Sequence, residues 1–392
     1  MILKMKSTYI NQKAFDEINL RFIGKMVKAY APVDRTGNLN EFHKSYQQIP
    51  KTFSDAKSWE ECCFTRAQEI WDKGKPVTLF WSGGIDSTCA FLALRKTMSS
   101  TDRLHIRYTQ HSINENPNLL KDIQQFTENP ISKDGFFNPK VLERDHIFVT
   151  GECGDQCFGS DVLEIRGNAL NESWQTALLW DNIWAKDFEM GRNRPTIDER
   201  NILWELLEEH VLRSPIEIKS VFDLLWWINF SIKWEWVDKR IFLHFFRYPD
   251  LSKNCSFFYH TEFQKWSLAN HEIKHNNSWN TYKQPAKDWI YSINKDADYQ
   301  KNKTKERSII QLYSSKIYSE KYTKENLGSW TLAAAAYNAG NYGISRRLKA
   351  QKVNNYYDAK LPNETERYVF RILALKEIIS NPAKYGFIFD KE

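Results

Sequence analysis

Several features that mark whole classes of protein are missing from this chain. No run approaches the roughly 18 apolar residues of a membrane span. The first residues, MILKMKSTYINQ, contain neither an apolar core nor a cleavage signature, so we expect no secretory leader. The 55 Lys and Arg residues against 49 Asp and Glu form no long basic run, and the net charge is only +6. That balance suits an enzyme for anionic nucleotides but does not by itself argue for nucleic acid.

Cysteine is scarce and is not spaced for disulfide or zinc chemistry. The six cysteines include no CxxC pair. In a chain without a leader, they are typical of buried thiols in a reducing compartment. Cys153 and Cys157 are four residues apart and could form half of a metal site, but nothing in the sequence supplies the other ligands. We therefore expect a cytoplasmic protein without membrane contact.

The chain is long enough for more than one domain. Its 392 residues, 42% of them hydrophobic, predict two or three domains with a real core. We divide it into a helical lead-in over residues 1–75, an α/β domain over 76–310 and a helical region over 311–392. Within the lead-in, Ser58–Trp71 begins with a cap candidate and has acidic residues in its first turn, which predicts a helix.

One stretch organises the α/β domain. Val77–Trp81 has the pattern of a buried strand, and Thr88–Leu94 that of an apolar helix. A glycine turn between them lets the backbone approach a phosphate, and the first helical N–H groups point at it. Asp86 is unusual there, because a carboxylate repels phosphate unless Mg²⁺ lies between them. The candidate anion-binding residues are Ser82, Gly83, Gly84, Asp86, Ser87 and Thr88.

The pattern SGGxDS resembles the pyrophosphate loop of the N-type ATP pyrophosphatases, which include asparagine, GMP and argininosuccinate synthetases and tRNA-modifying enzymes. It is not the Walker loop, GxxxxGK[ST]. The resemblance implies a parallel sheet of the adenine nucleotide alpha hydrolase type with helical insertions. It also implies ATP and Mg²⁺ as cofactors. A chance Ser/Gly turn before a core helix is the alternative reading of the same residues.

Two further strands are predicted, over Arg103–Thr109 and Asp145–Thr150. In a doubly wound sheet, ligands bind beyond the carboxyl ends of such strands. The end of the first, Tyr108–Ser112, is where the resemblance implies contact between backbone and adenine. The second runs into Gly151–Gly159, with the sequence GECGDQCFG.

GECGDQCFG resembles the second signature of the asparagine synthetases. The match includes Gly151 and Glu152, which we assign to cofactor binding, and Asp155. By this resemblance Asp155 shares Mg²⁺ and pyrophosphate contact with Asp86, and both are catalytic and metal-ligand candidates. The pattern departs from the family at Gln156, where a Glu is usual, which puts a further metal or water contact in doubt.

Downstream of this signature the sequence is mostly helical. Apolar residues recur at three and four from Ser173 to about Phe246. Four tryptophans there, Trp226, Trp227, Trp234 and Trp236, could stack on bases, but an aromatic stripe at helical spacing is more often core, and we favour core.

Further on, the synthetase resemblance continues in order. Lys283–Ile290 resembles the family's Lys-containing helix. Lys301–Lys303 resembles its Arg-x-Lys element, which makes Lys303 a catalytic candidate that stabilises the leaving pyrophosphate, with Lys305 second. A solvated charge run is the alternative for these lysines.

The last eighty residues resemble something else. Trp330–Gly340 (WTLAAAAYNAG) and Leu361–Val369 (LPNETERYV) are similar to the C-terminal half of the goose-lysozyme-like lytic transglycosylases, over about residues 312–387. That resemblance implies a sugar groove lined by Tyr337, Asn338 and Tyr368, with peptidoglycan as partner. The family's catalytic glutamate and its G-L-x-Q stretch are not found, so the cleavage has no proton source. An ordinary helical bundle, or a recombined reading frame, stays open.

The predicted function is ATP-dependent adenylation of an unidentified acceptor, small or macromolecular, followed by attack of ammonia or an amine. The residues before Val77 are too few for the amidohydrolase domain of glutamine-dependent asparagine synthetases, and Ile2 stands where a nucleophilic cysteine would follow Met1. We therefore expect no ammonia-generating half. Three alternatives stay open: a peptidoglycan-cleaving glycosidase, a wall-binding module on the tail, and a nucleic-acid base-modifying enzyme of the same loop family.

Overall fold

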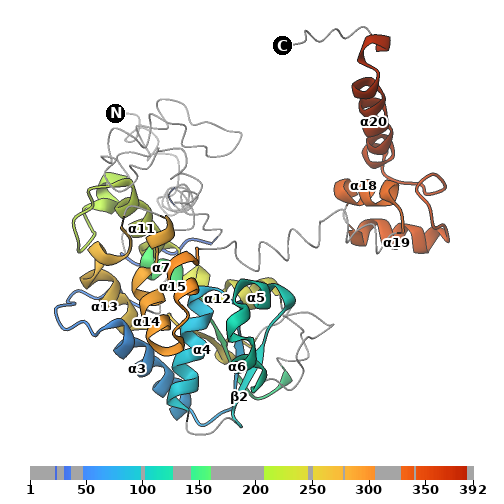
Figure 1. The fold of residues 1–392 in the computed structure, drawn as a ribbon. Helices are drawn as coiled ribbons and strands as arrows, with labels where there is room; N and C mark the ends of the chain where they lie inside the picture. The colour runs from blue at the N-terminus through green and yellow to red at the C-terminus, as the bar shows by residue number, and fades with distance from the viewer. Residues whose placement is uncertain are drawn as a thin grey trace. The chain divides into compact units, whose positions relative to one another are not determined.

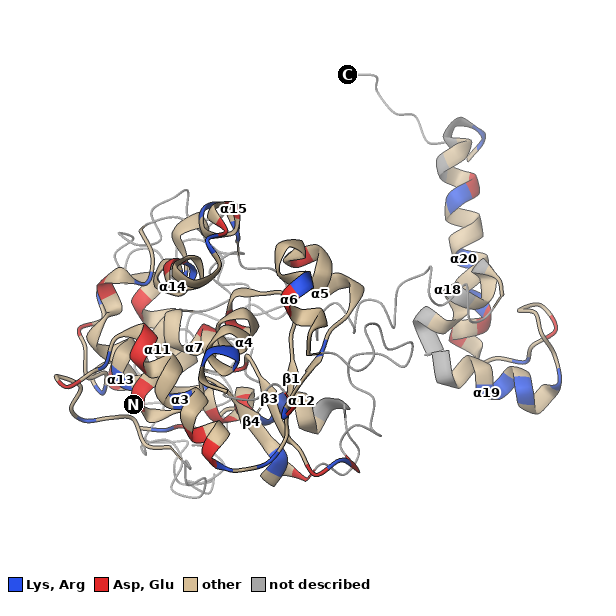
Figure 2. Cartoon of the chain, turned by 60° about the horizontal axis from the view of Figure 1, so that its bottom comes forward, with Lys and Arg blue, Asp and Glu red and all other residues tan. Residues whose placement is uncertain are grey.

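The computed structural model divides into two compact units, Met1–Glu306 and Arg307–Glu392, which are described separately (Figure 1). The structure describes residues 23, 31–36, 47–98, 102–126, 143–159, 207–245, 250–276, 279–304, 328–339 and 341–385. Most of the predicted lead-in up to residue 46 lies outside these ranges. In Figure 2, basic and acidic residues are interspersed along the elements of both units.

A four-stranded parallel sheet forms the centre of the first unit. Its order is β2 (Leu104–Arg107), β1 (Val77–Phe80), β3 (Ile147–Thr150) and β4 (Asn254–Ser256), and every neighbouring pair is parallel. The α/β class and the three predicted strands are confirmed. The fourth strand was not predicted, since Asn-Cys-Ser carries no strand pattern.

Burial along the strands follows their position in the sheet. The central strands β1 and β3 are buried at every residue, as expected where helices cover both faces of a parallel sheet. In the edge strand β2, Leu104 and Ile106 are buried while His105 and Arg107 are partly exposed. Helix α4 (Ile85–Thr97) follows β1 and packs against α3 (Trp59–Asp72) and α14 (Gln284–Asn294).

The order of the strands makes a topological switch point between β1 and β3. The chain leaves β1 through α4 and returns as β2 on one side, whereas β3 pairs with the other side of β1. Loops leaving the carboxyl ends of two such strands diverge, and ligands bind at that switch point in open α/β sheets. Ser82 and Gly151 belong to these two loops.

Helix α3 begins at the predicted cap. The Ser58 side chain accepts a hydrogen bond from the Glu61 N–H at 3.2 Å, and Glu61 Oε2 accepts one from the Ser58 N–H at 2.8 Å. This reciprocal capping box satisfies two N–H groups that the helix leaves unpaired.

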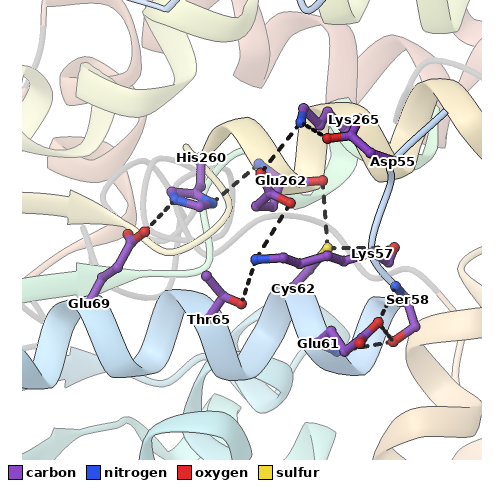
Figure 3. A network of polar contacts seen from close by, with 10 residues as sticks. All are labelled: Asp55, Lys57, Ser58, Glu61, Cys62, Thr65, Glu69, His260, Glu262 and Lys265. Carbon is purple, nitrogen blue, oxygen red and sulfur yellow. Dashed lines mark hydrogen bonds and ion pairs between the residues drawn. The ribbon is translucent and has the colours of Figure 1, made fainter. Parts of the chain in front are cut away.

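Polar contacts join α3 and the residues just before it to α13 (Thr261–Ala269) and its N-cap residue, as Figure 3 shows. Lys265 Nζ lies 2.6 Å from Asp55 Oδ2. His260 Nε2 lies 2.9 Å from Glu69 Oε1, and Lys57 Nζ lies 3.7 Å from Glu262 Oε2. Such partly exposed pairs each contribute little to stability, so they fix orientation while the buried side chains between the helices supply most of the energy.

The aromatic stripe belongs to the core. Helix α11 (Val221–Ile232) carries Trp226 and Trp227, and α12 (Trp234–Phe245) begins with Trp234; all three tryptophans are fully buried. The Trp226 ring stacks on Phe230 with centroids 5.2 Å apart. The core reading is confirmed for these three, so they offer no exposed platform for a base.

A buried arginine ties an early segment to this aromatic core. Arg35 donates to the Gln47 carbonyl at 3.1 Å and to the Phe230 carbonyl at 2.6 Å, and its guanidinium lies 4.9 Å from the Trp234 ring centroid. Burial lowers the pKa of Arg35 to about 10, so the group keeps its charge at neutral pH. Carbonyl and ring contacts offset part of the cost of burying that charge.

In the second unit, the described residues form helices with a small core of their own. The elements are α18 (Trp330–Ala339), α19 (Asn341–Gln351) and α20 (Asn363–Ser380). Leu332 and Ile344 are fully buried. The hydroxyl of the buried Tyr356 donates to the Thr365 carbonyl at 3.2 Å, which ties the loop after α19 to the first turn of α20.

Candidate functional site

The turn after β1 needs a glycine. Gly83 has φ +83°, and a Cβ built there would lie 2.2 Å from the carbonyl oxygen of Ser112. No side chain can occupy that space without a shift of the backbone. The Tyr299 hydroxyl donates to the Gly83 carbonyl at 3.2 Å, so α15 (Ala297–Asn302) packs directly on the turn.

Hydroxyl groups hold the turn in shape. The Ser82 N–H donates to Ser87 Oγ at 3.0 Å, the two serine hydroxyls are 2.8 Å apart, and the Gly84 N–H donates to Ser82 Oγ at 3.2 Å. Thr88 is different, because it is fully buried and its Oγ1 accepts from the Trp81 indole at 3.1 Å. Its geometry fits a core contact, and the predicted contact with a cofactor stays a prediction.

Helix α4 begins without a side-chain cap. Its N-cap is Gly84, which makes no capping hydrogen bond, and Asp86 lies in its first turn. The first N–H groups of this 13-residue helix therefore receive no hydrogen bond from a capping side chain, and they lie at the positive end of the helix dipole. Together with the glycine turn, this arrangement suits an anion.

The loop after β3 fits tightly against the first one. A Cβ at Gly151 would lie 2.8 Å from the Ser87 N–H nitrogen, and a Cβ at Gly154 would lie 2.4 Å from Asp86 Cγ. Cys153 has a left-handed φ of 70° before α7 (Gly154–Phe158), a costly conformation for a non-glycine residue. The two signatures therefore meet in space.

Lys283 joins the two carboxylates. Its Nζ lies 2.6 Å from each carboxylate oxygen of Asp86 and 2.8 Å from Asp155 Oδ1. The Lys283 side chain is 0% exposed, whereas the two aspartates keep 18% and 17% of their side chains exposed. The ammonium is thus on the buried side of a carboxylate pair that still reaches the surface.

Sequence reasoning did not select Lys283. The resemblance placed it in a Lys-containing helix but made Lys303 the candidate. One signal was available: Lys283 comes just before Gln-Pro at the start of α14, and it forms the helix N-cap with a left-handed φ of 61°. Nothing local indicates its partners, which lie 197 residues away in sequence for Asp86.

The two aspartates could hold a divalent cation. The described part of the chain contains no group of three or more His, Cys, Asp or Glu residues that could hold a metal. Mg²⁺ is often held by one or two carboxylates, with substrate phosphates and water completing six oxygen ligands. Asp86 and Asp155 fit that pattern in donor type and in their partial exposure.

Two neighbours of Asp155 have other partners. Glu152 receives a hydrogen bond from Arg240 Nη2 on Oε1 at 3.0 Å and pairs with Nε through its other oxygen. Gln156 is buried and donates to Asn229 Oδ1 at 3.0 Å. Gln156, where the sequence differs from the asparagine synthetase signature, therefore faces the core. A Glu at this position would be buried without the water that normally solvates a carboxylate. The predicted role of Glu152 in cofactor binding stays a prediction.

Lys303 lies near the glycine turn but is paired. Its Nζ lies 3.1 Å from Glu115 Oε2, and both side chains are below 10% exposed, at 9% and 7%. His111 Nε2 lies 2.7 Å from the other oxygen of Glu115. The structure does not bring Lys303 to Asp86 in any described contact, and Lys305 lies outside the described residues.

The predicted sugar-groove residues are only partly described. Tyr337 and Asn338 belong to α18, but their side chains lie outside the described residues, and Tyr368 is half-buried on α20. Two acidic residues upstream of this region, Glu320 and Glu325, also lie outside them. Within the described residues, no helix is both long and apolar enough to span a membrane.

Comparison with known proteins gives one short similarity. The chain is 36% identical over 63 residues to the membrane-bound lytic murein transglycosylase D of Escherichia coli K12, and equally to that of Escherichia coli O6:H1. The match covers 15% of this chain and 14% of each relative. No family model matches the chain, and no solved structure matches it.

Proposed function

We propose that the Met1–Glu306 unit carries out ATP-dependent adenylation of a substrate with release of pyrophosphate, on a sheet of the adenine nucleotide alpha hydrolase type. The observation that carries the proposal is the meeting of Asp86, Asp155 and Lys283 between the carboxyl ends of β1 and β3. Two carboxylates with a buried cation, beside an uncapped helix N-terminus, suit a polyphosphate with its metal.

Each element of the site has a role in this reaction. The turn at Ser82–Ser87 and the first N–H groups of α4 bind the β- and γ-phosphates. Asp86 and Asp155 would hold Mg²⁺, which supplies positive charge to the phosphate oxygens. Lys283 adds a second positive charge to the same place. Protein groups therefore position the reactants and neutralise charge, as in other phosphoryl-type transfers.

The chemistry balances without further reagents. A carboxylate or amide oxygen of the substrate attacks the α-phosphorus of ATP, the bond to the bridging oxygen breaks, and pyrophosphate leaves with its electron pair. The new adenylate then reacts with ammonia or an amine, which displaces AMP and releases one proton to water. Negative charge builds up on the leaving pyrophosphate as the bridging bond breaks. A cation beside those oxygens therefore lowers the barrier.

Pyrophosphate exchange into ATP tests the proposal. Labelled pyrophosphate should enter ATP only when the correct acceptor is present, so amino acids, tRNA and DNA are screened as acceptors. A nucleic-acid substrate should bind with a steep salt dependence, whereas a small acid should not. Exchange by the parent protein that persists unchanged in an Asp86→Asn variant would exclude this site.

A second function is supported by the transglycosylase similarity. We propose that the Arg307–Glu392 unit binds peptidoglycan through Tyr337, Asn338 and Tyr368, as a wall-binding module. The matched relatives are named as murein transglycosylases, and several elements of the tail resemble that class in order. Cosedimentation with purified cell wall tests it: loss of binding on Tyr368→Ala supports the module, and equal binding by the variant contradicts it.

A further inference from the structure

We infer that Lys283 is an internal counter-ion which occupies the place of a divalent cation, so that the aspartate pair binds free metal poorly until a polyphosphate draws the ammonium away. The inference deepens the proposed function, since it concerns the same two carboxylates. It assigns Lys283 as a positioning residue that couples metal binding to nucleotide binding.

The geometry of the ammonium supports this role. Lys283 Nζ lies 2.6 Å from both carboxylate oxygens of Asp86, in the short range of charge-assisted hydrogen bonds, and forms an ion pair with Asp155 Oδ1 at 2.8 Å. A divalent cation seeks the same oxygens. The ammonium and the metal therefore compete for one set of ligands.

Charge leads to the same conclusion. Asp86, Asp155 and Lys283 together carry one net negative charge, and without the ammonium the pair would carry two. A divalent ion bound to the aspartates would also lie within a few ångströms of the Lys283 ammonium. The two positive charges would repel each other strongly, because salt and water screen charges weakly in this partly buried place. Free metal in the cell should therefore occupy this site less than two bare carboxylates would.

Hydrogen bonds hold the backbone of Lys283 in place. Its N–H donates to the Lys274 carbonyl at 3.1 Å, its own carbonyl accepts from the Lys287 N–H at 3.1 Å, and its φ of 61° is left-handed. The side chain is also beside aromatic rings, with Nζ 5.9 Å from the Phe158 ring centroid. The side chain is the flexible part of this residue, and a polyphosphate bound at the glycine turn would offer its ammonium new oxygen partners.

The test measures metal binding without turnover. Mn²⁺ titration by electron paramagnetic resonance is done on the full chain without nucleotide. Lys283→Met should bind Mn²⁺ at least about tenfold more tightly than the parent, and its unfolding temperature should rise with added Mg²⁺. Lys283→Arg keeps the charge and should gain neither effect. The double variant Lys283→Met with Asp86→Asn should lose the gain.

A matched control comes from the same helix. Lys287 is also buried, but its Nζ donates to the carbonyls of Asn280 and Lys303 and not to a carboxylate. Lys287→Met should lower stability without any gain in Mn²⁺ affinity. If it gained as much as Lys283→Met, general loosening would explain the effect and the inference would be overturned.

The inference stays testable if Lys283→Met does not fold. The parent protein should then bind free Mn²⁺ as weakly as Asp86→Asn, and addition of a non-hydrolysable ATP analogue should strengthen Mn²⁺ binding in the parent alone. Tight binding of free Mn²⁺ by the parent, abolished by Asp86→Asn, would overturn the counter-ion role. Tighter Mn²⁺ binding by Lys283→Met in a protein that shows no pyrophosphate exchange would support this inference and contradict the proposed adenylation. Pyrophosphate exchange without tighter Mn²⁺ binding would support adenylation and contradict this inference.

Discussion

The α-carbon of Gly154 faces the carboxylate of Asp86 so closely that a Cβ at Gly154 would lie 2.4 Å from Asp86 Cγ and from its Oδ1. The two residues come from different loops, after β3 and after β1. Their contact fixes where the Asp86 carboxylate points, and with it the ammonium of Lys283 that both loops share.

Gly154→Ala should therefore displace Asp86. We expect a loss of stability of about 1–3 kcal/mol, typical of overpacking, and a fall in pyrophosphate exchange of about a hundredfold, since a small misplacement of a catalytic group has that cost. Gly343→Ala is the matched control, because its Cβ would meet nothing closer than 3.5 Å. Chemical denaturation and exchange are measured on both, and an active, stable Gly154→Ala would contradict the contact.

Asp155→Asn should weaken the dependence on Mg²⁺. The substitution keeps the shape of the side chain but removes the charge that would hold the metal, so exchange should fall by about 10²-fold or more. Asp145→Asn serves as control, because Asp145 is exposed and pairs only at the surface with Lys75. An unchanged rate and an unchanged Mg²⁺ titration would show that the two aspartates do not share a metal.

The glycine turn should carry nucleotide protection. Ser82→Ala together with Gly84→Ala removes a hydroxyl that organises the turn, and adds a Cβ 3.3 Å from the Ser82 side chain position. ATP with Mg²⁺ should raise the unfolding temperature of the parent but not of the double variant. Equal protection of the two proteins would place nucleotide binding elsewhere in the chain.

Stability should fall in mild acid because of a buried histidine. Burial lowers the pKa of His275 to about 3, against 6.5 when unfolded. Between these values the unfolded chain binds the extra proton, so this histidine contributes stability that is present above about pH 6.5 and is lost toward pH 3.

Replacing His275 by Phe should reduce the slope of unfolding free energy against pH over that range. Urea unfolding at pH 7 and pH 5 measures it. The ring of His275 packs on Phe222 with centroids 3.9 Å apart, so Phe222→Leu disturbs the same contact without a titrating group. That control should destabilise the protein at both pH values and keep the slope. A slope unchanged in His275→Phe would refute the assignment.

The tail should not cleave peptidoglycan. The resemblance to the lytic transglycosylases places groove residues at Tyr337 and Tyr368 but finds no glutamate in that family's context, and a glycosidase acid needs surroundings that raise its pKa. We expect no anhydro-sugar fragments from purified cell wall, with the whole chain or with a version ending near Lys316. Activity that is lost on truncation and on Glu320→Gln or Glu325→Gln would instead make this a wall hydrolase.

Local patterns allowed much of the fold to be predicted. Val77–Phe80 is mostly apolar and is buried at every residue, as expected of a strand with both faces covered, and Ser58 with Glu61 marks the start of α3 through a capping box of sequence neighbours. The strand Asn254–Ser256 was missed because its pairing with β3, and not its composition, makes it a strand.

The site was predictable as far as its signatures are local. The two glycine loops could be found because each follows an apolar strand, and the parallel order brings such loops to one edge. Lys283 could not be chosen over Lys287 or Lys303, since all three are lysines in one charged stretch and only tertiary packing distinguishes their partners. The pairing of Glu152 with Arg240 could not be predicted from the sequence either, because the two residues are far apart along the chain.

The cysteines have a practical consequence. All six are buried as free thiols, and burial raises the pKa of Cys62 to about 12 and that of Cys63 far above its usual value. Thiols of this kind are almost never ionised at neutral pH, and the thiolate is the reactive form. A cysteine introduced at an exposed position such as Lys73 would thus react with maleimides well before the native ones, so fluorophores or spin labels could be attached at a chosen point without first removing any natural residue.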